Sequence, residues 1–146
     1  GFANPKMGEW IDSAIEADLH QEGAEDYTAK YREGKRLVQN ENGTFLKPSV
    51  VYCESFDHPL SNREFLCPYA SVVEAPQKDM LRLIGPTLVV TAISNDSSFK
   101  KDLLAATNIE RLNLGPISTM KISWDQPHEG NMFEFLYKRR SIGMAA

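Results

Sequence analysis

Apolar residues near the start of the chain recur at a spacing that predicts a helix, and the next segments alternate as strands do. Within residues 7–21 the apolar positions face away from an acidic surface: Trp10, Ile11, Ala14, Ile15 and Leu19. A second helical stretch is expected at 24–33, ending at Gly34. Segment 35–53 is typical of strand, turn and strand, because Asn42-Gly43 supplies the turn chemistry.

Further along the chain, short apolar segments alternate with amphipathic ones. The expected order is strand 69–75, helix 76–84 with Pro76 first, strand 86–94, helix 95–106 and strand 109–115. This order predicts right-handed crossovers and a mostly parallel sheet of the α/β class. A polar loop at 116–130 and a last helix at 131–140 complete one expected domain over residues 1–146.

Composition narrows the function classes. The 146 residues carry a net charge of −4, which disfavours a broad nucleic-acid surface. No apolar run reaches the roughly 18–20 residues that a membrane span needs, so no membrane partner is expected. Two cysteines do not make a disulfide framework, which favours a reducing, cytoplasmic setting. The chain begins with Gly1, interpreted as a cloning remnant on a piece of a longer protein.

The stretch Ser61–Val73 places Glu64 and Cys67 just before an apolar strand. A cysteine nucleophile needs a base, usually histidine, and an oxyanion pocket. No motif connects Cys67 to any of the three histidines, so catalysis by this thiol is not favoured.

A zinc site is a second reading of the same residue types. The candidate ligands are Cys53, His58, Cys67 and His128. Their spacing matches no compact ligand pair, so free thiols and ordinary imidazoles are the preferred interpretation and no metal is expected.

Phosphate-binding motifs are missing from the sequence, since neither GxGxxG nor GxxxxGK[ST] occurs. The loop 123–131 is a further candidate, because α/β sheets place ligands just after parallel strands. It carries Trp124, Asp125, His128 and Glu129, although an ordinary polar loop explains the same residues.

An ordered set of landmarks, rather than one sharp motif, carries a family resemblance over residues 7–140. The landmarks are Glu22-Gly23-Ala24, Pro48-Ser49-Val50, Glu64-Phe65-Leu66-Cys67-Pro68, Asn113 at a strand end and the "DQPHEG" loop at 125–130. Together they resemble the C-terminal third of an NAD(P)-dependent aldehyde dehydrogenase. The resemblance implies a fragment of that family's α/β catalytic domain, in a divergent member.

The resemblance implies roles for particular residues. Glu64 takes the place of the glutamate that accepts hydrogen bonds from the nicotinamide ribose hydroxyls. Leu66 stands where the family has an aromatic residue near the nicotinamide, and Cys67 replaces the glycine of the turn. Trp124, Pro127 and His128 belong to the loop that borders the aldehyde tunnel.

The family's catalytic cysteine and general-base glutamate lie upstream of this chain, so the chain itself is expected to hold no catalytic residue. In the parent enzyme the thiolate attacks the aldehyde, hydride passes to NAD or NADP, and water releases the acid. Family members are usually homo-oligomers, and the same is expected of the parent.

Two alternatives belong to other classes. In the first alternative, the chain is a non-catalytic module that binds a protein through one helix face, made of Trp10, Ile11, Ile15 and Leu19. In the second alternative, it is a zinc-binding regulatory domain.

Overall fold

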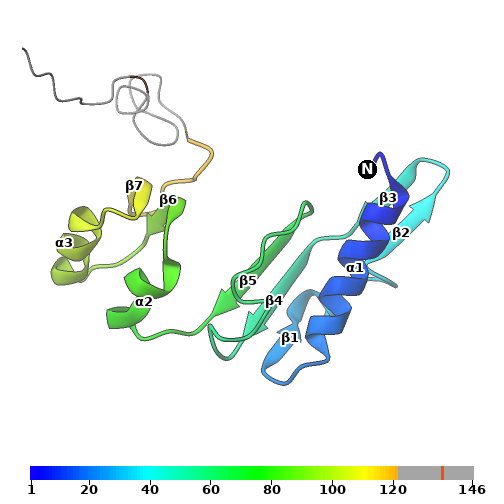
Figure 1. The fold of residues 1–146 in the computed structure, drawn as a ribbon, viewed down its shortest axis with the longest axis horizontal. Helices are drawn as coiled ribbons and strands as arrows, with labels where there is room; N and C mark the ends of the chain where they lie inside the picture. The colour runs from blue at the N-terminus through cyan, green and yellow to red at the C-terminus, as the bar shows by residue number, and fades with distance from the viewer. Residues whose placement is uncertain (122–135, 137–146) are drawn as a thin grey trace, which may run out of the picture. The chain divides into compact units, whose positions relative to one another are not determined.

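The computed structural model describes residues 1–121 and Leu136, and it divides the chain into two compact units, Gly1–Pro76 and Gln77–Ala146 (Figure 1). Both units combine helices with strands, which confirms the α/β class. Whether the two units act as one domain stays a prediction. Apart from Leu136, the expected last helix at 131–140 lies outside the described residues.

The first unit begins with helix α1 (Pro5–Leu19), which packs against a hairpin made of β2 (Leu37–Asn40) and β3 (Gly43–Leu46) (Figure 1). A second sheet has the order β1-β4-β5, with β4 (Ser49–Cys53) between β1 (Ala24–Asp26) and β5 (Tyr69–Val73). Strand β4 runs antiparallel to β1 and parallel to β5. The hairpin pairs Asn40 with Gly43, whose φ is 123°, so the predicted turn is confirmed.

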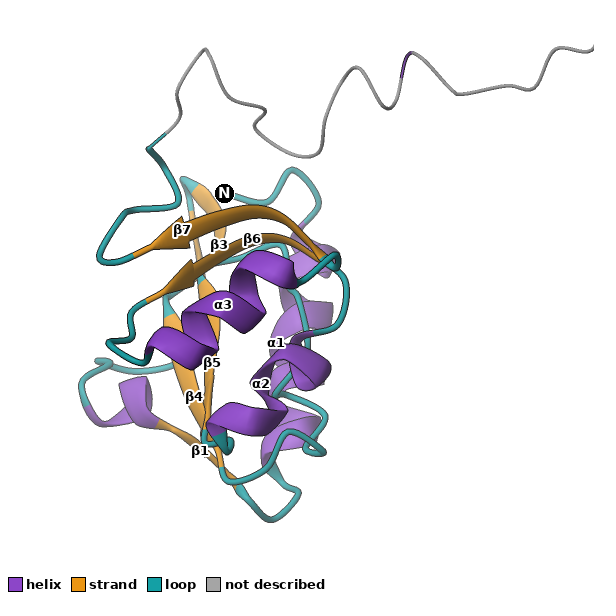
Figure 2. Cartoon of the chain, turned by 90° about the vertical axis from the view of Figure 1, so that its left-hand side faces the viewer, coloured by secondary structure: helices purple, strands orange, loops and turns teal. Residues whose placement is uncertain are grey.

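The second unit contains α2 (Gln77–Ile84), β6 (Thr87–Ala92), α3 (Ser97–Ala105) and β7 (Ile109–Leu114), in the order that the sequence predicts. Strands β6 and β7 pair in parallel, and α3 forms the crossover between them (Figure 2). Asp96 caps α3 by accepting hydrogen bonds from the backbone N–H groups of Ser98 and Phe99. The hydrogen bond from Gln77, the one from the Ser98 hydroxyl and these two backbone bonds together lower the pKa of the Asp96 carboxyl to about 2.

The described strand pairs are therefore mixed in direction. The β4–β5 and β6–β7 pairs are parallel, whereas β1–β4 and β2–β3 are antiparallel. Short connections explain the antiparallel hairpin, because a parallel pair needs a crossover of a dozen residues or more.

Helix α1 starts where local chemistry favours it. Asn4 accepts a hydrogen bond from the backbone N–H of Lys6 at 3.1 Å, and Pro5 occupies the first helical position, where no donor is lost. Gly8 lies inside the helix because β3 comes close there. A Cβ at Gly8 would be 2.8 Å from Cγ2 of Thr44, so no larger residue fits without movement.

The hydrophobic core of the first unit forms between α1 and the two sheets. Ile11 and Ile15 are fully buried against Val51 and Leu60, as the helical stripe predicts. Trp10 differs from the other members of that stripe, since its side chain is 59% exposed. Ile11 and Ile15 are four residues apart and therefore lie on the same face of the helix, whereas residue 10 lies at the edge of that face.

The predicted helix at 24–33 is wrong. Residues Ala24–Asp26 instead pair with Val51–Cys53 as β1, and only a single 3-10 turn, η1 (Tyr27–Lys30), follows. The Asp26 side chain accepts from the backbone N–H groups of Thr28 and Ala29, which begins the 3-10 turn after the strand. Pairing with β4 thus overrides the local helix propensity of this segment.

Candidate functional site

The turn Glu64–Pro68 is held in place by one buried side chain and by the backbone. Phe65 is 9% exposed and meets the ring of Tyr69 edge-on, with centroids 4.9 Å apart. The Cys67 N–H donates to the Phe65 carbonyl at 2.8 Å, and the Pro68 carbonyl accepts from Ser49 N–H at 3.0 Å. The turn is therefore fixed to the first residues of β4 and β5.

Glu64 and Leu66 flank the buried Phe65 in the sequence, and neither is buried. Glu64 is exposed, and within the described residues its carboxylate takes part in no hydrogen bond or ion pair. Leu66 is 79% exposed, which is unusual for a large apolar side chain. The turn thus exposes both a carboxylate that has no partner among the described residues and an apolar side chain. Such a carboxylate suits two vicinal hydroxyls, because its two oxygens accept from both.

A groove of about 410 Å³ adjoins Leu66 and is mostly apolar. Its walls come from the N-terminal segment, from β3 and from the turn: Gly1, Phe2, Ala3, Met7, Phe45, Leu46, Leu66, Cys67 and Pro68. Glu64 does not line this groove, so the two cofactor residues that the resemblance implies share one turn but not one cavity.

Neither cysteine has the surroundings of a nucleophile. Cys53 is completely buried, and burial raises the pKa of its thiol. Its Sγ lies 3.9 Å from Nδ1 of His58, but that nitrogen already accepts the backbone N–H of Leu60 at 3.1 Å. His58 is therefore not free to take the Cys53 proton through Nδ1. Burial also raises the pKa of Cys67, against a smaller opposing effect of the Arg36 charge.

The candidate zinc ligands do not come together in the part of the chain that is described. Cys53 and His58 are neighbours, but no group of three His, Cys, Asp or Glu side chains suited to a metal ion forms among residues 1–121 and Leu136. His128 lies outside the described residues, as do Trp124 and Pro127 of the predicted aldehyde loop.

Asn113, a landmark of the resemblance, lies near the end of β7. Its Nδ2 donates to Oγ1 of Thr91 on the neighbouring strand β6 at 3.1 Å, and Thr91 Oγ1 in turn donates to the Ile117 carbonyl. These bonds support a structural role for this asparagine, in holding the end of the parallel pair.

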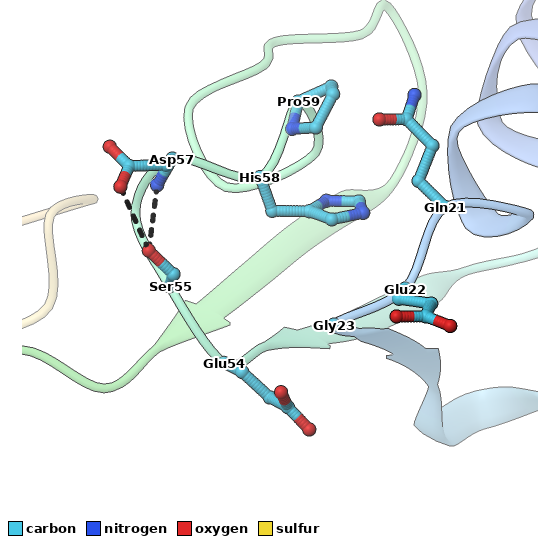
Figure 3. Close-up of a pocket in the computed structure, with 8 residues that line it drawn as sticks. All are labelled: Gln21, Glu22, Gly23, Glu54, Ser55, Asp57, His58 and Pro59. Carbon is cyan, nitrogen blue, oxygen red and sulfur yellow. Dashed lines mark hydrogen bonds between the residues drawn. The ribbon is translucent and has the colours of Figure 1, made fainter.

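A second pocket, of about 370 Å³, was not predicted from the sequence (Figure 3). Two groups of residues line it, one just before β1 begins and one just after β4 ends: Gln21, Glu22 and Gly23, and Glu54, Ser55, Asp57, His58 and Pro59. Gly23 and Glu54 are joined by a backbone hydrogen bond of 2.9 Å, one step beyond the Ala24–Cys53 pair. Only the antiparallel register of β1 and β4 brings these segments together, and no motif in the sequence reports that register.

Comparisons with known proteins find nothing that names this site. No protein-family model matches the chain, and no curated protein sequence matches it. Among residues 1–121 and Leu136, each helix falls short of the length and apolar character that crossing a membrane demands.

Proposed function

We propose that the chain is the C-terminal part of a divergent NAD(P)-dependent aldehyde dehydrogenase, and that Glu64 binds the nicotinamide ribose. The proposal rests on the landmarks of the sequence and on one observation in the structure. Glu64 is exposed and free of partners on a turn that Phe65 and Pro68 hold in place. A rigid turn with an unused carboxylate is preorganised to accept hydrogen bonds from a ligand.

The residues of the turn fit the cofactor in part. Glu64 offers the two acceptor oxygens that a ribose diol requires. Leu66 offers an apolar surface where the family has an aromatic ring, so it supplies contact area without ring stacking. When bound, NAD or NADP accepts the hydride of the reaction. The turn holds the ribose and excludes water on the Leu66 side.

The finer features of the proposal follow from the same resemblance. The parent enzyme's catalytic domain has a mostly parallel sheet, to which this chain contributes strands. The parent is a cytoplasmic homo-oligomer that oxidises an aldehyde to an acid. Its nucleophilic cysteine lies upstream of residue 1, and Trp124, Pro127 and His128 border its aldehyde tunnel.

The coding sequence upstream of residue 1 tests the proposal. An in-frame extension that carries a cysteine and a glutamate in aldehyde dehydrogenase context supports it, whereas a start codon directly before Phe2 contradicts it. The 146-residue chain alone is expected to oxidise no aldehyde. Aldehyde-dependent formation of NADH by this chain, with cofactor supplied, would overturn the assignment of the nucleophile to an upstream segment.

The protein-binding alternative retains one supporting observation, which is the exposure of Trp10. The rest of the predicted contact face does not favour it, because Ile11 and Ile15 are buried in the core of the first unit. An exposed single tryptophan is a smaller contact surface than such a module needs.

A further inference from the structure

The pocket between Gln21–Gly23 and Glu54–Pro59 contains a buried donor without an acceptor (Figure 3). His58 is 8% exposed, and its ring points towards the Gln21–Glu22 side of the pocket. Because Nδ1 accepts the Leu60 N–H at 3.1 Å, the neutral ring carries its proton on Nε2. This Nε2–H is buried and has no hydrogen-bond partner. An unpaired buried donor costs about 1–3 kcal/mol, so an acceptor at this position is favoured.

The rim of the same pocket is acidic. Glu22 and Glu54 both line it, and within the described residues neither pairs with a basic side chain. Oε2 of Glu54 lies near Gly23, 3.8 Å from where a Cβ on that glycine would stand, and in Figure 3 the Glu54 side chain points away from the His58 ring. Asp57 also lines the pocket, but in Figure 3 its carboxylate points away from His58 and accepts from Ser55 Oγ.

We propose that this pocket binds a small organic cation that also carries a carbonyl oxygen. The carbonyl accepts the hydrogen bond of His58 Nε2–H, and the positive charge lies between Glu22 and Glu54. The ligand needs both the carbonyl oxygen and the positive charge. A simple cation leaves the imidazole donor unpaired, and a neutral amide leaves the carboxylates without a counter-charge. The proposal concerns no residue of the Glu64–Pro68 turn and is independent of the proposed enzyme function.

Gln21 lines the same pocket. Its side chain donates one long hydrogen bond, of 3.4 Å, to Asp18. Gln21 is exposed, so its side chain moves at little cost when a ligand enters.

The test compares two probes on the 146-residue chain. Lysinamide carries two ammonium groups and a carboxamide, whereas 1,5-diaminopentane carries the ammonium groups alone. Binding is followed by the imidazole resonances of His58 in long-range ¹H–¹⁵N spectra. Lysinamide is expected to shift them saturably and to bind about tenfold more tightly than the diamine, which is the worth of one good hydrogen bond to a buried donor.

Variants separate the site from general attraction to an acidic protein. Glu22→Gln combined with Glu54→Gln is expected to weaken lysinamide binding at least about tenfold. Glu41→Gln, in the exposed β2–β3 turn, removes the same kind of charge elsewhere and is expected to leave binding unchanged. All three positions are exposed, so the variants should keep the fold.

Three results would overturn the proposal. One is equal affinity for the two probes, which would mean that His58 Nε2–H donates to an ordered water and not to the ligand. Another is equal weakening by Glu41→Gln, which would indicate attraction by net charge. The last is the absence of any shift of the His58 resonances at saturating lysinamide.

Discussion

The Asp26 carboxylate lies 3.2 Å from the guanidinium of Arg36 and 2.9 Å from that of Arg32, and all three side chains are almost completely buried. Arg36 also binds Asp12 and Glu16 of α1 and the hydroxyl of Ser49, the first residue of β4. One buried network therefore connects the helix, β1 and the strand whose first N–H holds the Glu64–Pro68 turn.

Asp26→Asn should destabilise the first unit strongly. The substitution removes a negative charge that two buried guanidinium groups share, and breaking such a buried pair costs about 3–5 kcal/mol. Glu25→Gln is the matched control, because Glu25 lies on the same strand and pairs with Lys30 at an exposed position. It is expected to change the free energy of unfolding by less than about 0.5 kcal/mol. Urea denaturation of both variants measures the difference, and equal losses would contradict the account.

The same aspartate makes stability depend on pH. Burial raises the pKa of Asp26, but hydrogen bonds from Thr28, Arg32 and Arg36 outweigh burial and hold it below the ordinary value of 3.8. Because the folded pKa is the lower one, the stabilisation is fully present above pH 3.8 and is lost as the pH falls through the folded value. The stability gap between wild type and Asp26→Asn should therefore be constant near neutral pH and shrink below pH 3.8. Denaturation series at several pH values test this, and a gap that grows in acid would refute it.

Gly8→Ala should destabilise the chain although alanine favours helices. The gain in helix propensity is about 1 kcal/mol, whereas the new methyl group meets Thr44 Cγ2 at 2.8 Å and Phe2 Cδ2 at 3.1 Å. Overpacking of this kind costs about 1–3 kcal/mol. Thr44→Ser removes the nearer methyl group and should reduce the cost of Gly8→Ala. A double-mutant cycle by thermal denaturation tests the coupling, and independent effects of the two substitutions would contradict it.

The two cysteines should differ in reactivity. Cys53 is fully buried while Cys67 is partly exposed, so an alkylating reagent reaches Cys67 in the native state and Cys53 only after local opening. Iodoacetamide followed by peptide mass spectrometry should show Cys67 modified at least about tenfold faster. The difference should vanish in denaturant. Equal rates in the native protein would contradict the described burial.

The sequence was informative where local chemistry decides the structure and misleading where pairing decides it. The stripe of Ile11 and Ile15 and the turn before Gly43 were both predictable, because each depends on neighbours in the chain. The strand at Ala24–Asp26 was not, since it exists only by pairing with β4. The His58 pocket depends on that same pairing and was missed for the same reason.

The motif alone made Glu64 a candidate for binding the cofactor. The sequence did not predict that Glu64 is exposed next to the buried Phe65. Alternation along the turn explains it, because one inward side chain leaves its two neighbours outward. The aldehyde loop with Trp124, Pro127 and His128 lies outside the described residues, so its predicted role stays a prediction.

The most direct measurement is the KM for NAD and NADP of the full-length enzyme that we propose, with and without Glu64→Gln. Loss of charge-assisted hydrogen bonds to the ribose should raise the KM for the cofactor about tenfold or more, while the exposed position keeps the loss of stability below about 0.5 kcal/mol. Glu41→Gln serves as the control and should leave the KM unchanged. An unchanged cofactor KM in Glu64→Gln, with the fold intact, would remove Glu64 from the site and contradict the central claim.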